Sequence, residues 1–190
     1  MSWWDSYRAV YGAELRAAAV EYEEHGWPLM AGPGTDLLLD TGTVLDVLEV
    51  PAAVGRRVCA TLRDRGLVVP VASTPQGTFW FPMTPNHPLP AELSLHTDVV
   101  LHTDGIGVLA PPTERPAGWV QWRVRPSFTG YVVPDAHVIV EAVQDAVRRR
   151  AVETQRAEST FDTARRASDA ALGDQRPDTQ RSAAAVTRGA

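Results

Sequence analysis

The first residues that could carry chemistry are the two acids of the segment Asp46-Val-Leu-Glu49, which ends just before Pro51. Carboxylates at a strand end supply the hard oxygen ligands that Mg²⁺ and Mn²⁺ prefer. Phosphoryl transfer with two metal ions needs two or three such acids to converge. Residues three apart on a strand point to opposite faces, so Glu49 joins Asp46 only if the strand ends or bulges between them. The alternative is one acid at a strand end and a second acid that caps the following helix.

A second candidate is the repeated pattern Leu95-His-Thr-Asp98 and Leu101-His-Thr-Asp104. On one continuous strand, His96, Asp98, His102 and Asp104 would share a face. Two imidazoles and two carboxylates on one face could bind a divalent metal. The alternative is a solvated face of an antiparallel sheet, with Asp104-Gly105 as the turn of a hairpin.

Two tryptophans near the end of the strand-rich region are candidates for ligand binding. Trp119 and Trp122 follow the glycine-flanked segment that ends in Pro111-Pro112-Thr113. Their spacing places them on opposite faces of a strand, so we expect one to be buried and the other partly exposed. An exposed tryptophan could stack on a nucleic-acid base, or it could cover the edge of the core.

The elements that position these residues follow from apolar periodicity and from turn residues. Helices are predicted over 3–25, from Pro51 to Gly66 and from Pro134 onward, and Arg56 lies on the open, arginine-rich face of the second helix. The predicted strands are 27–30, 36–40, 43–50, 67–72, 78–81, 95–101, 106–110 and 119–124. Because successive strands are joined by short turns, the sequence predicts an α+β fold with a mostly antiparallel sheet flanked by helices.

The chain divides into a domain over residues 1–150 and a polar tail over 151–190. The tail is rich in Ala, Arg, Asp, Thr, Gln and Ser, and we expect it to have no core of its own. We expect a frayed helix to about residue 172 and disorder beyond it. Such a tail could serve as a flexible linker or contact a protein partner.

The composition excludes several classes of structure and function. The 190 residues are 44% hydrophobic and carry a net charge of −5, and no apolar run is long enough to span a membrane. Cys59 is the only cysteine, which excludes an internal disulfide and predicts a cytoplasmic protein. The absence of lysine excludes a Walker-type phosphate loop and Schiff-base catalysis, and the arginine-rich, lysine-free composition indicates a GC-rich genome. The net negative charge argues against a protein that coats DNA nonspecifically.

Several segments taken in order resemble one family. They are Glu21-Tyr-Glu-Glu-His-Gly-Trp-Pro28, Asp46-Val-Leu-Glu-Val-Pro51, Gln76-Gly-Thr-Phe-Trp-Phe81, and Val108-Leu-Ala-Pro-Pro-Thr113 with Trp122. Over about residues 8 to 148 the chain resembles the N-terminal domain of bifunctional DNA primase/polymerases, of the archaeo-eukaryotic primase type. The likeness is to a small actinobacterial branch of that family.

The resemblance implies specific site residues. Active members carry two acids with one residue between them, a histidine on the strand after the glycine turn, and a third acid before the Ala-Pro-Pro segment. In this sequence the acids Asp46, Glu49 and Asp98 would hold Mg²⁺ or Mn²⁺. However, Leu48 stands in the second place of the Asp46 pair, and Val100 matches the third acid more closely than Asp98.

The histidine of the family pattern has no counterpart, because its strand reads Thr78-Phe79-Trp80. His96, His102, Arg56 and Trp122 are the remaining candidates for contact with a nucleotide. We therefore expect a degenerate primase-polymerase-like domain with a nucleotide-binding, DNA-binding or regulatory role. One alternative is an active metal-dependent nucleotidyltransferase, in which His96 or His102 replaces the missing histidine. The other is a protein-interaction module without a nucleic-acid role.

Overall fold

The computed structural model describes the backbone of residues 3–30 and 36–173, and the side chains of residues 11–30 and 36–166. The chain forms two units, which divide after Arg148. The last helix, α4 (Ala136–Gly173), begins in the first unit and supplies the described part of the second.

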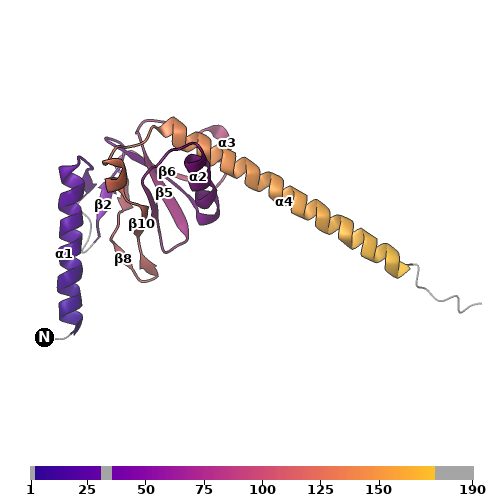
Figure 1. Cartoon of the computed structure of the whole chain (residues 1–190), viewed down its shortest axis with the longest axis horizontal. Helices are drawn as coiled ribbons and strands as arrows, with labels where there is room; N and C mark the ends of the chain where they lie inside the picture. Colours follow the sequence, from indigo (N-terminus) through magenta and orange to yellow (C-terminus); the bar gives the residue numbers. More distant parts are fainter. Residues whose placement is uncertain (1–2, 31–35, 174–190) are drawn as a thin grey trace, which may run out of the picture. The chain divides into compact units, whose positions relative to one another are not determined.

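The first unit is built around a five-stranded antiparallel sheet with the strand order β10-β4-β5-β3-β6 (Figure 1). The five strands are β3 (Asp46–Pro51), β4 (Val71–Ser73), β5 (Thr78–Met83), β6 (Val100–His102) and β10 (Gln121–Val124). A second antiparallel sheet joins β1 (Leu29–Met30), β2 (Leu38–Asp40) and β7 (Gly107–Leu109). A two-stranded ribbon pairs β8 (Glu114–Arg115) with β9 (Gly118–Trp119). The predicted α+β class with antiparallel pairing is confirmed.

One face of the five-stranded sheet packs against α2 (Ala52–Asp64), α3 (Ala91–Ser94) and the first turns of α4. We call it the helix face. Alternate residues of β3, such as Leu48 and Val50, point into this core, where they meet Val54 and Val58 of α2. The apolar positions at helical spacing in 51–66 thus do cover the sheet, as the sequence predicts.

The opposite face, which we call the aromatic face, packs against α1 (Trp3–Glu24) and the smaller sheet. Its core holds Val47, Trp80 and Trp27 together with Tyr22 of α1. The 3₁₀ helix η1 (Pro126–Thr129) follows β10, and Tyr131 then joins this core. Tyr11 and Tyr22 of α1 are core residues of this face.

The predicted hairpin over 95–110 is wrong. Residues 95–99 form a turn after the short helix α3, and only Val100–His102 are in strand conformation. That strand pairs with β3 in the large sheet, whereas β7 pairs with β2 in the small sheet. Asp104 and Gly105 do turn the chain with positive φ, but the turn connects two sheets rather than two partner strands.

Element boundaries differ modestly elsewhere. Pro51 is the last residue of β3 and the cap of α2, rather than its first helical residue, because its ψ of 144° is extended. The strand expected over 67–72 is confined to Val71–Ser73, and the strand expected over 119–124 is divided between β9 and β10. Helix α4 reaches Gly173, close to the predicted end of the tail helix. The disorder predicted beyond residue 173 falls outside the described residues.

In the second unit, the residues of α4 are exposed at every described position up to Arg166. They include two large apolar side chains, Val152 and Phe161. Among the described helices, none is both long enough and apolar enough to cross a membrane.

Candidate functional site

The two acids of β3 point to opposite faces of the sheet. Asp46 lies on the helix face and is only 1% exposed. Its Oδ2 accepts a hydrogen bond from the backbone N–H of Asn86 at 3.1 Å, and its Oδ1 has no partner among the described residues. Glu49 lies on the aromatic face, because β3 continues to Pro51 without a bulge. The three-residue spacing therefore separates the two carboxylates.

The third predicted acid, Asp98, does not lie on a strand beside Asp46 or Glu49. Asp98 is exposed in the turn that follows α3, and His96 lies at the start of that turn. The carboxyl groups of Asp46, Glu49 and Asp98 are thus distributed over two faces and a surface turn. Within the described part of the chain, no three His, Cys, Asp or Glu side chains form a group that could hold a metal ion.

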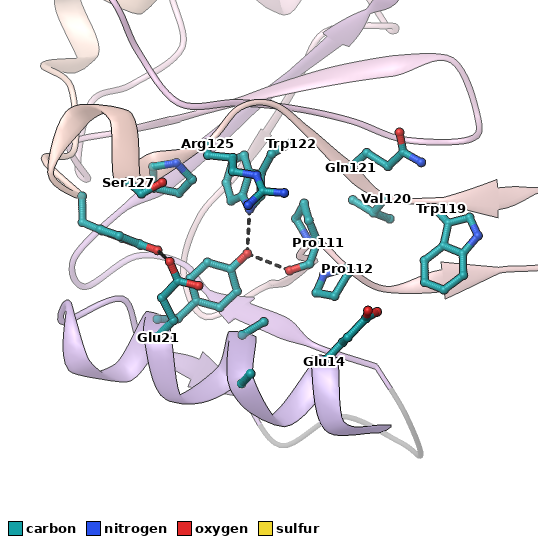
Figure 2. Close-up of a pocket in the computed structure, with 15 residues that line it drawn as sticks. Glu14, Glu21, Pro111, Pro112, Trp119, Val120, Gln121, Trp122, Arg125 and Ser127 are labelled. Carbon is teal, nitrogen blue, oxygen red and sulfur yellow. Dashed lines mark hydrogen bonds between the residues drawn. The ribbon is translucent and has the colours of Figure 1, made fainter. Parts of the chain in front are cut away.

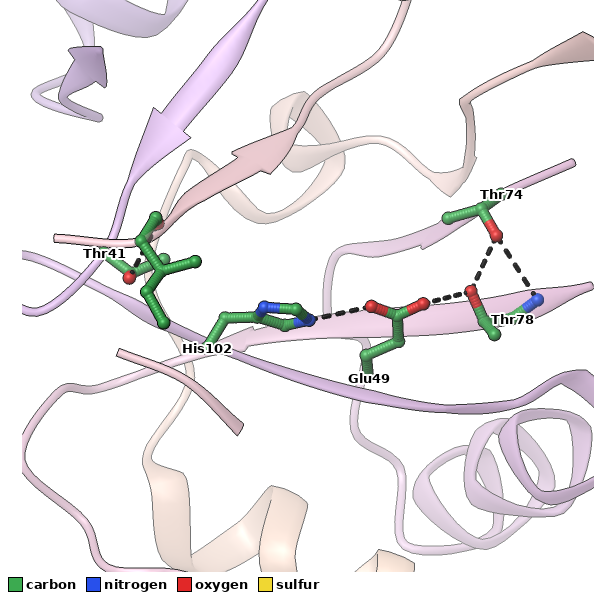
Figure 3. A network of polar contacts seen from close by, with 6 residues as sticks. Thr41, Glu49, Thr74, Thr78 and His102 are labelled. Atoms are coloured by element: carbon green, nitrogen blue, oxygen red, sulfur yellow. Dashed lines mark hydrogen bonds and ion pairs between the residues drawn. The ribbon is translucent and has the colours of Figure 1, made fainter. Parts of the chain in front are cut away.

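Glu49 instead belongs to a hydrogen-bonded chain that crosses the aromatic face (Figure 3). Its Oε2 lies 2.7 Å from Nε2 of His102 on β6, and its Oε1 accepts from the Thr78 hydroxyl at 2.5 Å. Thr78 Oγ1 in turn lies 2.6 Å from Thr74 Oγ1. The bond from His102 and, next, the bond from Thr78 hold the pKa of Glu49 below its ordinary value, against the opposing effect of burial.

The register shows which side chains surround this carboxylate on its own face. Val47 lies two residues before Glu49 on β3, and Val100 of β6 lies directly opposite it. Trp80 of β5 is the cross-strand neighbour on the other side. Glu49 therefore has both oxygens engaged, and two of its nearest positions on this face carry valine.

A pocket of about 530 Å³ opens further along the aromatic side, between α1 and the segment around β10 (Figure 2). The α1 wall presents Glu14, Glu21 and Tyr22, with Ala17 and Ala18 between them. Because both central residues are alanines, the helix leaves room for a ligand at this position. The volume lies in the range of small-molecule sites.

The opposite wall combines aromatic and polar groups. It consists of Pro111, Pro112, Trp119, Val120, Gln121, Trp122, Arg125, Pro126, Ser127 and Tyr131. Trp119 and Trp122 are both half-buried and both line the pocket. Their predicted placement on opposite faces is wrong, because Val120 leaves the β9 ribbon before β10 begins and so resets the alternation.

Buried hydrogen bonds fix the rear of the pocket. The Tyr22 hydroxyl donates to the carbonyl oxygen of Pro111 at 2.7 Å and accepts from the indole N–H of Trp122 at 2.9 Å. The Trp122 ring also packs edge to face against Trp80 and Trp27, at 4.9 and 6.1 Å between ring centroids. Burial raises the pKa of Tyr22 well above its ordinary value, so the hydroxyl keeps its proton for this network.

The charged groups of the pocket are distributed unevenly. Glu21 accepts a hydrogen bond from the Tyr131 hydroxyl, and burial together with this bond raises the pKa of Tyr131. Arg125 and Glu14 form no hydrogen bond or ion pair with any residue that the structure describes. The pocket thus offers one guanidinium and one carboxylate that are available to a ligand.

Of the residues predicted for nucleotide contact, only Trp122 lines this pocket. His102 lies in the Glu49 chain on the same face of the sheet, whereas Arg56 is exposed on α2, which covers the other face. Trp119, also a candidate from the sequence, lines the pocket too, together with residues that the sequence does not single out, such as Glu14, Tyr22 and Arg125. The only sequence signal for the α1 wall is the run of three alanines at 17–19 between two glutamates seven residues apart, a pattern also typical of an ordinary exposed helix face.

Known proteins offer no further guidance to this site. Comparisons of the chain with protein-family models, with curated proteins and with solved structures returned no match.

Proposed function

We propose that this protein is a catalytically degenerate primase-polymerase-like domain that binds a nucleotide in the pocket between α1 and β10, with a binding or regulatory role. The observation that carries the proposal is the joint presence in one pocket of Trp119, Trp122 and Arg125, whose guanidinium has no hydrogen-bond or ion-pair partner among the described residues. Indole rings stack on bases, a contact worth about 1–3 kcal/mol per base. A guanidinium supplies paired donors to a phosphate group.

The arrangement of the acids supports loss of catalysis. In the resemblance, two acids one residue apart on β3 and a third acid near Val100 would hold the metal ions. In this chain the pair reads Asp46 and Leu48, which lie on the helix face, and Val100 stands near the place of the third acid. On the aromatic face Glu49 has Val47 and Val100 as neighbours, so a single carboxylate stands there. That carboxylate is engaged by His102 and Thr78. Mg²⁺ or Mn²⁺ enters the proposal only as a companion of the nucleotide phosphates.

The active alternative requires Asp46, Glu49 and Asp98 to act on one site. Asp46 lies in the helix-face core and Asp98 in an exposed turn, so this alternative would require the sheet to rearrange. DNA could still bind, because stacking and phosphate contacts serve single strands as well as nucleotides. A cytoplasmic location is part of the proposal, supported by the lone, half-buried Cys59.

A protein-interaction role is a second candidate, favoured by one observation. Leu67, Val68, Phe128 and Val132 are exposed around a shallow groove of about 400 Å³, and Phe128 is 77% exposed. Clustered apolar side chains on a surface mark contact sites. Self-association tests this face: a full chain that dimerises and becomes monomeric on Phe128→Ser would favour the candidate, and a monomeric wild type would count against it.

The nucleotide proposal is tested by thermal-shift titration of the full chain with each nucleoside mono- and triphosphate, with and without Mn²⁺, beside a primer-extension assay. A ligand that binds only the folded state raises the melting temperature, and the stabilisation grows with the logarithm of the ligand concentration above its Kd. We expect a shift with no primer extension. Arg125→Gln should reduce the shift, and Arg63→Gln, an exposed arginine of α2, serves as the matched control. Extension that Asp46→Ala abolishes would overturn the proposal, as would the absence of any shift.

A further inference from the structure

We infer that the pocket is selective for a guanine nucleoside monophosphate, with Glu14 reading the base and Arg125 holding the phosphate. The inference rests on the proposed function. It specifies which base, and how many phosphate groups, the nucleotide in that pocket carries. It is carried by the placement of two charges on facing walls of the pocket, Glu14 on α1 and Arg125 after β10, neither of which has a hydrogen-bond or ion-pair partner among the described residues. Figure 2 shows the Glu14 carboxylate on the Trp119 side of the pocket and the Arg125 guanidinium beside Trp122.

The base end of the pocket is defined by Trp119. Its ring packs edge to face against Tyr11 of α1, with ring centroids 5.1 Å apart. Glu14 lies one helical turn after Tyr11, and therefore on the same side of α1. The Tyr11 hydroxyl also accepts a hydrogen bond from the backbone N–H of Glu114 at 2.7 Å, which ties α1 to the ribbon that presents Trp119. A base stacked on this indole would place its polar edge within reach of Glu14.

The phosphate end is defined by Arg125. Its guanidinium lies beside Trp122, whose indole N–H donates to the Tyr22 hydroxyl, and this places it at the Glu21–Tyr22 end of the pocket. Seven residues separate Glu14 from Glu21, a rise of about 10.5 Å along the helix. This spacing is comparable with the distance from the polar edge of a purine to its 5′-phosphate in a nucleoside monophosphate. The Ser127 side chain lines the same end and can add a hydroxyl donor.

The choice of guanine follows from the chemistry of a carboxylate. An ionised carboxylate has two acceptor oxygens and no donor. Guanine presents two adjacent donors, N1–H and the N2 amino group, and can bind both oxygens at once. Adenine places an acceptor nitrogen at the corresponding position, beside a single amino donor. Hypoxanthine keeps N1–H but lacks the amino group, so it offers one bond of the two.

The charge balance favours a monophosphate. The pocket contains one guanidinium, but it also contains the carboxylates of Glu14 and Glu21. Added phosphates would bring further negative charge close to Glu21, and like charges at short distance repel. A single phosphate can be paired with Arg125 and brings less negative charge close to Glu21 than a triphosphate does.

The test is calorimetric titration of the full chain with GMP, IMP, AMP, guanosine and GTP. We expect GMP to bind most tightly, IMP more weakly, and AMP about tenfold or more weaker than GMP, as the loss of a bidentate base contact implies. Glu14→Gln should remove most of the preference for GMP over AMP. Glu23→Gln, an exposed α1 residue outside the pocket, should leave it unchanged.

The outcomes separate the two proposals. Equal affinity for GMP and AMP, or a GMP preference that survives Glu14→Gln, would overturn the guanine assignment and leave nucleotide binding intact. GTP binding tighter than GMP would overturn the monophosphate assignment. If no nucleotide binds, the proposed function itself fails. Because Glu14 is exposed, Glu14→Gln is expected to fold normally, and its melting temperature checks this.

Discussion

The indole N–H of Trp122 donates to the hydroxyl of Tyr22 at 2.9 Å, and this bond links two residues that lie 100 positions apart in the sequence. It joins α1 to β10, and the same hydroxyl donates to Pro111. Both walls of the pocket therefore depend on one buried tyrosine. The pocket owes its shape to contacts between distant segments rather than to any local motif.

Tyr22→Phe should destabilise the protein by about 1–3 kcal/mol, because it leaves the Trp122 N–H and the Pro111 carbonyl without their buried partner. Urea denaturation followed by tryptophan fluorescence measures this loss. We also expect weaker nucleotide binding, since Trp122 loses a restraint on its orientation. An unchanged denaturation midpoint would show that the hydrogen bonds contribute nothing to stability.

Glu49 gives the protein a specific dependence on pH. The bonds from His102 and Thr78 lower its pKa in the folded state below its ordinary value of 4.5. Its contribution to stability is therefore present above about pH 4.5 and is lost as the pH falls through the lower folded-state pKa. Glu49→Gln should make the fall in stability over this acidic range less steep, as measured by denaturation at successive pH values. Glu24→Gln, an exposed residue of α1, should leave the slope as it is in the wild type.

Gly55 is required by the close packing of α2 on the sheet. A Cβ at this position would lie 2.6 Å from Cβ of Phe79, too close for any side chain. Gly55→Ala should therefore destabilise the fold by about 1–3 kcal/mol through overpacking, although alanine is the better helix former. Combining it with Phe79→Leu should recover part of the loss, and a double-mutant cycle measures the coupling. Additive effects would contradict the packing explanation.

Substitutions of Asp46 distinguish a structural role of its carboxyl group from a catalytic role. Asp46→Ala removes a buried acceptor from the Asn86 N–H, so we expect a loss of about 1–3 kcal/mol in the free energy of unfolding. Asp46→Asn keeps an acceptor and should be tolerated better. Nucleotide affinity, measured under conditions where each variant is folded, should equal that of the wild type. Loss of binding in Asp46→Asn would place this carboxyl in the site instead.

Much of the fold could be predicted because its signals are local. The amphipathic pattern of α2 and the glycine after α1 fix these helices within a few residues. The separation of Asp46 from Glu49 also follows from strand periodicity, provided that β3 continues past Glu49, as it does. The pairing of β6 with β3 could not be predicted in this way, because strand pairing depends on contacts distant in the sequence.

The candidate site was harder to predict than the fold. Trp122 could be singled out as a base-stacking candidate, but its partners Tyr22 and Arg125 come from different segments and match no motif. The two tryptophans share the pocket only because Val120 interrupts the strand, which the alternating pattern does not reveal. The repeated motif predicts His102 as a metal ligand and the resemblance makes it a candidate nucleotide contact, yet its imidazole bonds Glu49.

The most direct test of the central claim is to follow the indole N–H signals of Trp119 and Trp122 by NMR while the full chain is titrated with GMP, after assignment through Trp119→Phe and Trp122→Phe variants. We predict saturable shifts of both signals with one binding constant, weakened about tenfold in Arg125→Gln. Both signals remaining unchanged as GMP reaches saturating concentration would contradict a nucleotide site in this pocket.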